Sequence, residues 1–147
     1  MSLCLVKVSP ALAGRITADP DLLDQLWPAD EEDVPPAEPD AEIAAIDRDQ
    51  DTLFEDFLDI SRQIDEKPAG YPWMRRALNG TGTEIEYDFG YENGFIVTAQ
   101  EAAEIADGLT HEGWWRPGQE ITLISHAIAA FYRSAAVAGR TVIGGVS

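Results

Sequence analysis

The stretch from Phe95 to Leu109, FIVTAQEAAEIADGL, contains a strand pattern that is followed directly by a helix pattern. Its first three residues are aromatic or β-branched, which favours a strand. Thr98 and Glu101 have the T-x-x-E spacing of a capping box, in which a hydroxyl and a carboxylate accept hydrogen bonds from the free amides at a helix start. The apolar residues that follow recur at i, i+3, i+4 and i+7, which predicts a helix packed by one narrow face. These residues are Ala102, Ile105, Ala106 and Leu109.

The two ends of the chain add further strands to this unit. The uncharged run 141–146 predicts a buried strand, and the run 3–6 predicts another, which leads into a helix with Ser9 as N-cap and Pro10 at the first position. Strands at both ends and in the middle, separated by helices, predict an α/β fold. We expect one compact three-layer domain over residues 1–147, in which helices cover a mixed β-sheet.

Four other segments have recognisable patterns. In residues 52–64 the apolar side chains fall at i, i+4, i+7 and i+11, which predicts an amphipathic helix. Residues 43–46 predict a short strand, and residues 71–78 predict a helix with Trp73 on its buried side. The longest apolar stripe of the chain predicts a last helix over residues 121–139.

The chain is strongly acidic, with 27 Asp and Glu against 10 Lys and Arg and a formal net charge of −17. Such a protein repels phosphate backbones and anionic membrane surfaces, so neither nucleic acid nor a membrane is an expected partner. The charge is uneven, since residues 1–67 have a net charge of −13 and residues 68–147 one of −4. The segment 28–40, PADEEDVPPAEPD, contains four prolines and six acids, which predicts an acidic, proline-rich surface loop.

Cysteine usage and hydropathy indicate the compartment. Cys4 is the single cysteine and lies in a strand-like apolar run, which predicts a buried, unreactive thiol. No segment has the apolar length of a signal peptide core or of a membrane helix. We therefore expect a cytoplasmic protein.

Three stretches together resemble a known family. They are DFGY at 88–91, VTAQE at 97–101 and FYRSAA at 131–136. With the opening strand and the helix around Trp73, their order resembles the YfbM-like family of small bacterial proteins over most of the chain. The resemblance implies a bacterial protein with a compact three-layer α/β domain. It implies no catalytic residues, because the family has no established activity.

The sequence contains no recognisable catalytic or metal-binding set. His111 and His126 fall on different predicted elements, His126 is expected at the surface, and no HExxH or CxxC spacing occurs. Neither a G-x-S-x-G nucleophile elbow nor a glycine-rich phosphate-binding motif is present. We expect no catalytic residues, no metal ion and no cofactor.

Two groups of residues are candidates for binding. Glu84, Glu86 and Asp88 alternate with apolar residues, so a strand places three carboxylates on one face, as in a solvated edge strand or a cleft of paired carboxylates. Trp114 and Trp115 are consecutive, so at least one of them is predicted at the surface. The candidate binding residues are Trp73, Glu86, Asp88, Tyr91, Trp114 and Trp115.

Two functions fit these observations. The first is a non-enzymatic acidic binding protein that masks a basic partner protein, as an immunity protein or an inhibitor does, with electrostatic attraction that speeds association. The alternative is a small-molecule binder or small enzyme with a cleft of carboxylates and aromatic rings around Asp88, Tyr91, Trp73 and Trp115. The charge and the lack of a catalytic set favour the binding protein over the enzyme.

Overall fold

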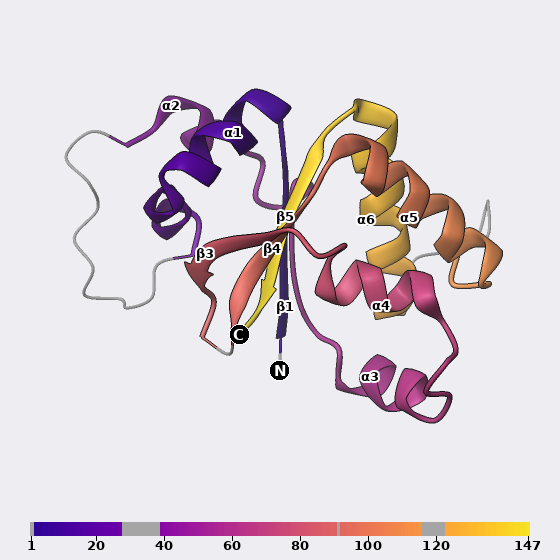
Figure 1. Ribbon diagram of the computed structural model, residues 1–147. Helices are drawn as coiled ribbons and strands as arrows, with labels where there is room; N and C mark the ends of the chain where they lie inside the picture. Colours follow the sequence, from indigo (N-terminus) through magenta and orange to yellow (C-terminus); the bar gives the residue numbers. More distant parts are fainter. Residues whose placement is uncertain (1, 28–38, 91, 116–122) are drawn as a thin grey trace.

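One five-stranded sheet with helices on both faces forms the frame of the computed structural model (Figure 1). The structure describes residues 2–27, 39–90, 92–115 and 123–147. The strands are β1 (Ser2–Val8), β2 (Thr52–Asp56), β3 (Glu84–Asp88), β4 (Asn93–Val97) and β5 (Thr141–Val146). The helices are α1 (Pro10–Ala18), the 3-10 helix η1 (Pro20–Gln25), α2 (Ala41–Ala44), α3 (Leu58–Asp65), α4 (Pro72–Asn79), α5 (Ala99–His111) and α6 (Ile124–Ala138).

The strands lie in the order β2-β1-β5-β4-β3, and their four pairings are all antiparallel. The α/β fold class is confirmed, but the described strands contain no parallel pair, so the expectation of a mixed sheet is wrong in this respect. The uncharged runs of β1 and β5 indicate burial on both faces, which is common in parallel sheets. Here helices cover both faces of antiparallel strands, and the same apolar composition results.

Two helical layers enclose the sheet, which gives the three layers expected (Figure 1). On one face α1, η1 and α2 pack on the sheet, and on the other α3, α4, α5 and α6 do. The first core includes Val6, Leu12, Ile16, Leu23 and Ile143. The second includes Leu5, Ile105, Leu109, Ile128 and Tyr132. Successive residues of a strand point to opposite faces, so β1 and β5 supply side chains to both cores.

The two ends of the described chain meet at the centre of the sheet. β5 lies between β1 and β4, and it is the strand that joins the pair β2-β1 to the pair β4-β3. Beyond the last ladder residues, the Ser2 amide donates to the Ser147 carbonyl oxygen and the Ser147 amide donates to that of Ser2, each over 3.0 Å. The N and C labels of Figure 1 therefore lie side by side.

The stretch from Phe95 to Leu109 folds as its pattern predicts. β4 ends at Val97, and Thr98 and Glu101 form the capping box, with N···O distances of 3.1 and 3.2 Å between each amide and the other residue's side chain. The four apolar residues of the α5 stripe are all buried. This confirms the predicted unit of a strand followed by a helix that packs by one face.

Residues 43–46 do not form the predicted strand. Residues 41–44 are helix α2, because the Asp40 carboxylate accepts hydrogen bonds from the amides of Glu42 and Ile43 over 3.0 and 3.2 Å and caps the helix. The same carboxylate pairs with the Arg15 guanidinium on α1. The cap and the ion pair decide the local structure, and neither follows from the apolar pattern.

The single helix predicted over residues 52–64 is two elements, strand β2 and helix α3. Leu53 pairs with Leu5 of β1, while Ile60 and Ile64 form the buried face of α3. Phe57 lies between the two elements and is also buried. The four apolar residues therefore all reach the core, and their spacing fits a strand, a turn and a helix as well as one helix.

Candidate functional site

Strand β3 is one of the two edges of the sheet, and its outer side has no neighbour among the described strands. Ile85, Tyr87 and Phe89 pack in the core that contains η1, so the alternate side chains point to the other face. Glu84, Glu86 and Asp88 are exposed there. We call this outer side of β3, with its three carboxylates, the acidic edge. It is the solvated edge strand that the alternation predicts, and its charges disfavour uncontrolled pairing with other sheets.

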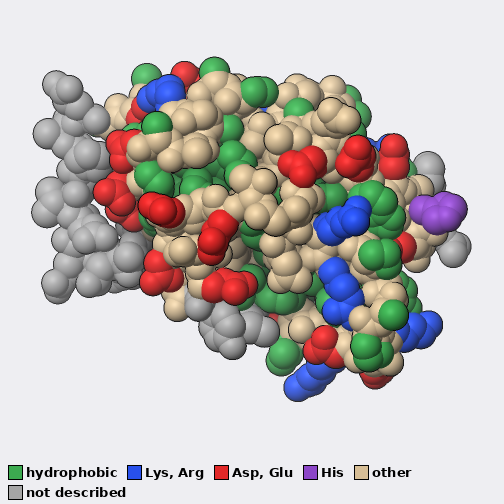
Figure 2. Space-filling view, in the orientation of Figure 1, with side chains coloured by type: hydrophobic (Ala, Val, Ile, Leu, Met, Phe, Trp, Pro, Cys, Tyr) green, Lys and Arg blue, Asp and Glu red, His purple; other side chains and the backbone are tan. Residues whose placement is uncertain are grey.

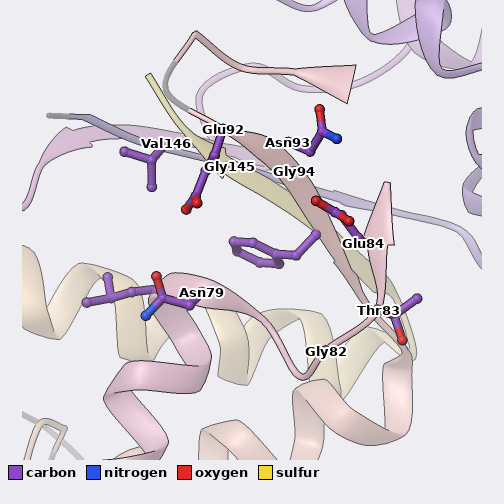
Figure 3. Close-up of a pocket in the computed structure, with 11 residues that line it drawn as sticks. Asn79, Gly82, Thr83, Glu84, Glu92, Asn93, Gly94, Gly145 and Val146 are labelled. Carbon is purple, nitrogen blue, oxygen red and sulfur yellow. The ribbon is translucent and has the colours of Figure 1, made fainter. Parts of the chain in front are cut away.

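A pocket of about 220 Å³ lies beside the acidic edge, between β3, β4, β5 and the end of α4 (Figure 3). Its apolar lining includes Phe95 and Val146, and its polar lining includes Asn79, Glu84 and Glu92. Glu84 comes from β3, Glu92 directly precedes β4, and Asn79 comes from the end of α4 (Figure 3). The pocket therefore combines an apolar base with two carboxylates and an amide.

Glycines let the Phe95 ring lie at the base of this pocket. Gly80 ends α4 with a φ of +82°, and a Cβ atom at this residue would lie 2.6 Å from Phe95 Cβ. A Cβ atom at Gly144 on the neighbouring strand would lie 2.7 Å from Phe95 Cζ. Carbon atoms do not approach so closely, so the ring packs directly against the backbone at both residues and is itself buried.

A second aromatic ring packs on the opposite face of the same strands. Cβ atoms at Gly94 and Gly145 would lie 2.3 and 2.2 Å from the Phe89 ring, which therefore takes the space where side chains of β4 and β5 would be. Phe89 also contacts Tyr87 and Trp27, with ring centroids 5.0 and 5.4 Å apart. These contacts hold the acidic edge against η1 from the side that faces away from the pocket.

A hydrogen bond between side chains of β3 and η1 completes this support. The Tyr87 hydroxyl donates to the Asp24 carboxylate of η1 over 2.7 Å. Burial raises the pKa of Tyr87 above its ordinary value, and the hydrogen bond and negative charge of Asp24 raise it further. Tyr87 therefore stays a protonated donor, and its role at this site is structural.

The candidate residues of the acidic group lie on or near β3, but they do not line the pocket. Glu86 and Asp88 are exposed on the strand, and the Asp88 carboxylate accepts a hydrogen bond from the Gly90 amide over 2.7 Å, which holds the following turn. Tyr91 lies outside the described residues. The carboxylates that line the pocket are those of Glu84 and Glu92.

The three candidate tryptophans lie elsewhere, where α4 begins and α5 ends. Trp73 was expected on the buried side of its helix but is half-buried, and Met74 takes the buried position. Its ring packs flat on Gly108 of α5, where a Cβ atom would lie 2.1 Å from the ring, and the Arg76 guanidinium lies 4.5 Å from the ring centroid. No described contact joins the tryptophans to the acidic edge, so the structure does not bring the candidates into one cleft.

Glu112 organises this second region, and sequence reasoning missed it. Its carboxylate accepts hydrogen bonds from the amides of Trp73 and Met74 over 2.9 and 3.1 Å, and from the Trp114 indole over 3.1 Å. It thus caps α4 from the end of α5. Trp114 is buried in this arrangement, whereas Trp115 is partly exposed beneath the Arg133 guanidinium, as expected for consecutive residues.

Charged side chains are unevenly distributed on the face shown in Figure 2. Acidic side chains lie over the part of the molecule that contains η1 and β3 and also on the half that contains α4 and α5, and most of the visible Lys and Arg lie over α3 and α4. None of the ion pairs among the described residues involves Glu84, Glu86 or Asp88.

The described residues contain no cluster of three or more His, Cys, Asp or Glu side chains suited to a metal ion. Cys4 is buried as predicted, and burial raises the pKa of its thiol. His126 is half-buried, contrary to expectation, because Ser125 and Ala129 beside it on α6 face the core. Within the described ranges no helix has the length and apolarity to cross a membrane.

Comparison with known proteins supports the fold. No family model and no curated protein matches the sequence. Among solved structures, the chain is similar to YfbM from Escherichia coli, a protein described as being of unknown function, with a TM-score of 0.57 and 14% sequence identity over 98% of each chain. A similarity at this identity shows the fold alone. The resemblance to the YfbM-like family is therefore supported as a YfbM-like fold.

Proposed function

We propose that this protein is a non-enzymatic binding protein whose acidic edge associates with a basic partner protein. The observation that carries the proposal is the row formed by Glu84, Glu86 and Asp88. These are three exposed carboxylates that form no ion pair with another described residue, at a sheet edge that no other described strand covers. Unpaired charges on one surface attract a partner of opposite charge and orient it before contact. The formal net charge of −17 of the whole chain adds a long-range attraction for the same basic partner.

The basic side chains give further support, because many of them serve contacts within the protein. Lys7, Arg15 and Arg140 form ion pairs with carboxylates of the first half of the chain. Arg75 donates to the carbonyl oxygens of Ile64 and Gly70 over 2.6 and 2.9 Å. These basic groups are therefore held away from the acidic edge, whose negative field they do not cancel.

Two matched variants test this proposal. The edge variant carries Glu84→Gln, Glu86→Gln and Asp88→Asn. The control variant carries Glu55→Gln, Asp65→Asn and Glu66→Gln, which removes the same charge from exposed residues around β2 and α3. Each immobilised protein is exposed to an extract of the source cells at low salt and at about 1 M salt, where the Debye length is about 3 Å.

The expected result is one basic protein that the unmodified and control proteins retain at low salt. The edge variant should lose it, and high salt should release it, because both treatments remove the attraction of the acidic edge. Equal retention by the two variants contradicts the proposal, and so does retention of acidic proteins alone. Titration of the purified partner against the three proteins then gives the affinities.

The pocket supports a second candidate function, the binding of a small cationic molecule between Glu84 and Glu92. Two carboxylates around an apolar base suit a ligand with a cationic group and an apolar body. Arginine amide and putrescine are direct probes, followed through the NMR shifts of the amides of residues 92–95. Saturable shifts that disappear in Glu92→Gln support this function, since Glu92 lies outside the acidic edge. Shifts that follow ionic strength alone contradict it.

A further inference from the structure

We infer that the outer side of β3 accepts an extended basic segment of the partner as a sixth strand of the sheet. The inference rests on the proposed function and specifies how the partner is held. Addition of a strand to a free sheet edge uses main-chain hydrogen bonds for affinity and alternate side chains for specificity. The acidic edge offers both kinds of contact.

The backbone of β3 presents groups at its outer side that do not pair with another described strand. The Ile96 amide donates to the Thr83 carbonyl oxygen over 3.0 Å, and Ile85 is paired with Gly94, so Thr83 and Ile85 direct their polar backbone groups toward β4. The hydrogen-bonding groups of a strand alternate between its two edges. The amide and carbonyl of Glu84 therefore point outward, where an incoming strand would meet them.

The side chains of the acidic edge select the charge of the incoming segment. Glu84, Glu86 and Asp88 lie on one face of β3, because the intervening side chains pack in the core with η1. Side chains directly opposite each other on neighbouring antiparallel strands lie about 4.5 to 5.5 Å apart at Cβ. The register of β3 against β4 shifts between Ile85 and Asp88, so this regular spacing applies at Glu84. A segment with Lys or Arg opposite Glu84 would therefore place a cation beside that carboxylate, and further cations along the segment would face Glu86 and Asp88.

The pocket extends this selectivity on the same face. Glu84 is paired with Phe95 across β3 and β4, and both residues line the pocket. A long cationic side chain opposite Glu84 can lay its methylene groups toward the apolar base while its charge meets the Glu84 and Glu92 carboxylates. This arrangement favours Lys or Arg over a short side chain at that position.

The other edge of the sheet lacks this combination. On β2 the acidic residues Glu55 and Asp56 are consecutive, so their side chains point to opposite faces. Phe54, which precedes Glu55 on the same strand, is 60% exposed, so this edge presents an apolar ring where the alternating pattern of β3 has a carboxylate. Charge complementarity to an alternating basic segment therefore distinguishes β3 from β2.

Two synthetic peptides test the inference. The first alternates Lys with Val and Thr. The second has the same sequence with the backbone amide of each Lys that would pair with β3 N-methylated, which keeps the charge and removes the ladder donors. We expect the first peptide to bind with NMR shifts along residues 83–89 and to slow hydrogen exchange of the Glu84 amide. We expect the affinity of the methylated peptide to be lower by about tenfold or more, because its ladder hydrogen bonds are lost.

A pair of substitutions gives a second readout on the protein itself. Glu84→Gln removes the charge and keeps the outward backbone amide. Glu84→Pro removes the charge and the amide donor, and proline is tolerated in a sheet mainly on an edge strand such as β3. Strand addition predicts that Glu84→Pro loses more affinity for the first peptide than Glu84→Gln does, in protein whose thermal unfolding shows it to be folded. If Glu84→Pro unfolds, the comparison of the two peptides decides.

The outcomes separate the inference from the proposed function. Equal, salt-dependent binding of both peptides overturns strand addition and leaves charge-driven binding in place. Binding of neither peptide to the acidic edge contradicts the inference, whereas the capture experiment with the edge and control variants judges the proposed function on its own. Shifts along residues 52–56 in place of 83–89 also overturn the inference, because they assign the segment to β2.

Discussion

The two edge strands of the sheet, β2 and β3, have the same length, but they differ in which side chains they bury and expose. β3 packs Ile85 and Tyr87 against η1 and exposes its acidic side chains on the other face. β2 buries Leu53 and exposes the three residues that follow it, including the aromatic ring of Phe54. Both edges are charged, as free strands of soluble proteins commonly are. The difference teaches that a charged edge is not of one kind: on β3 the exposed carboxylates share one face of a strand that packs on η1, whereas on β2 the exposed charges lie on both faces.

The largest expected effect comes from truncating the buried Ile85 of β3, and it is compared with truncation of the exposed Phe54 of β2. Ile85 is 2% exposed, so Ile85→Ala should lower the free energy of unfolding by about 3 kcal/mol through lost burial and a cavity. Phe54→Ala is the matched change on β2 and should cost less than about 0.5 kcal/mol, because the ring is mostly in solvent. Urea unfolding followed by circular dichroism measures both. Similar losses in the two variants would remove the distinction between the edges.

Gly94→Ala tests the glycines that support β3. Its Cβ atom would lie 2.3 Å from the Phe89 ring and 2.7 Å from the Gly144 carbonyl oxygen, so we expect a loss of about 2 kcal/mol from overpacking. Gly14→Ala is the control, since nothing lies within 4 Å and the residue is in α1, where alanine should stabilise by up to about 1 kcal/mol. Hydrogen exchange in Gly94→Ala should rise along β3 more than along β2. An equal rise of the exchange rates along β2 and β3 would contradict the idea that Gly94 supports β3 in particular.

Tyr87→Phe removes the hydroxyl that binds Asp24 and should cost about 1 kcal/mol near pH 7. The pKa of Tyr87 is raised in the folded protein, so the unfolded chain ionises first, at about pH 10. The contribution of the hydroxyl is therefore complete below that pH and declines as the pH rises above it. Unfolding free energies of both proteins between pH 7 and pH 11 check this. A difference that grows above pH 10 would reverse the sign of the linkage.

The smallest effect is expected for the edge and control variants used in the capture experiment. Their substituted carboxylates are exposed and unpaired, so each set should change the free energy of unfolding by less than about 1 kcal/mol. Partial relief of the excess negative charge favours a slight stabilisation at low salt. Thermal unfolding of the three proteins at low and high salt measures this. A large loss in the edge variant alone would show that these carboxylates hold the fold.

Sequence reasoning succeeded where the structure is decided locally. The capping box of Thr98 and Glu101 and the stripe of α5 are contained in one continuous segment, so their pattern allows a single interpretation. It failed at residues 52–64, where Leu53 is a strand residue because it pairs with Leu5, a partner from the other end of the first half of the chain. The spacing of apolar residues indicates which side chains are buried, but it does not indicate which segment they pack against, and that segment decides between strand and helix.

The pocket could be predicted only in part for the same reason. Glu84 belongs to the alternating row that the sequence shows, whereas Asn79 and Glu92 come from the end of a helix and the start of another strand. Their approach depends on how Gly80 and Gly144 accommodate the Phe95 ring. The tryptophan region could not be predicted either. Glu112 accepts hydrogen bonds from both Trp73 and Trp114, which lie far apart in the sequence, and no short motif indicates this contact.

The central place of β5 has a consequence for how the chain is made. The pairs β2-β1 and β4-β3 come from earlier parts of the chain, and β5 is the strand that joins them. We therefore expect the two pairs to stay unjoined during synthesis until residues 141–146 have emerged from the ribosome. Contacts between segments so distant in sequence form slowly. We expect a chain that stops short of β5 to leave the inner edges of β1 and β4 unpaired, which exposes it to aggregation and to recognition by chaperones and proteases.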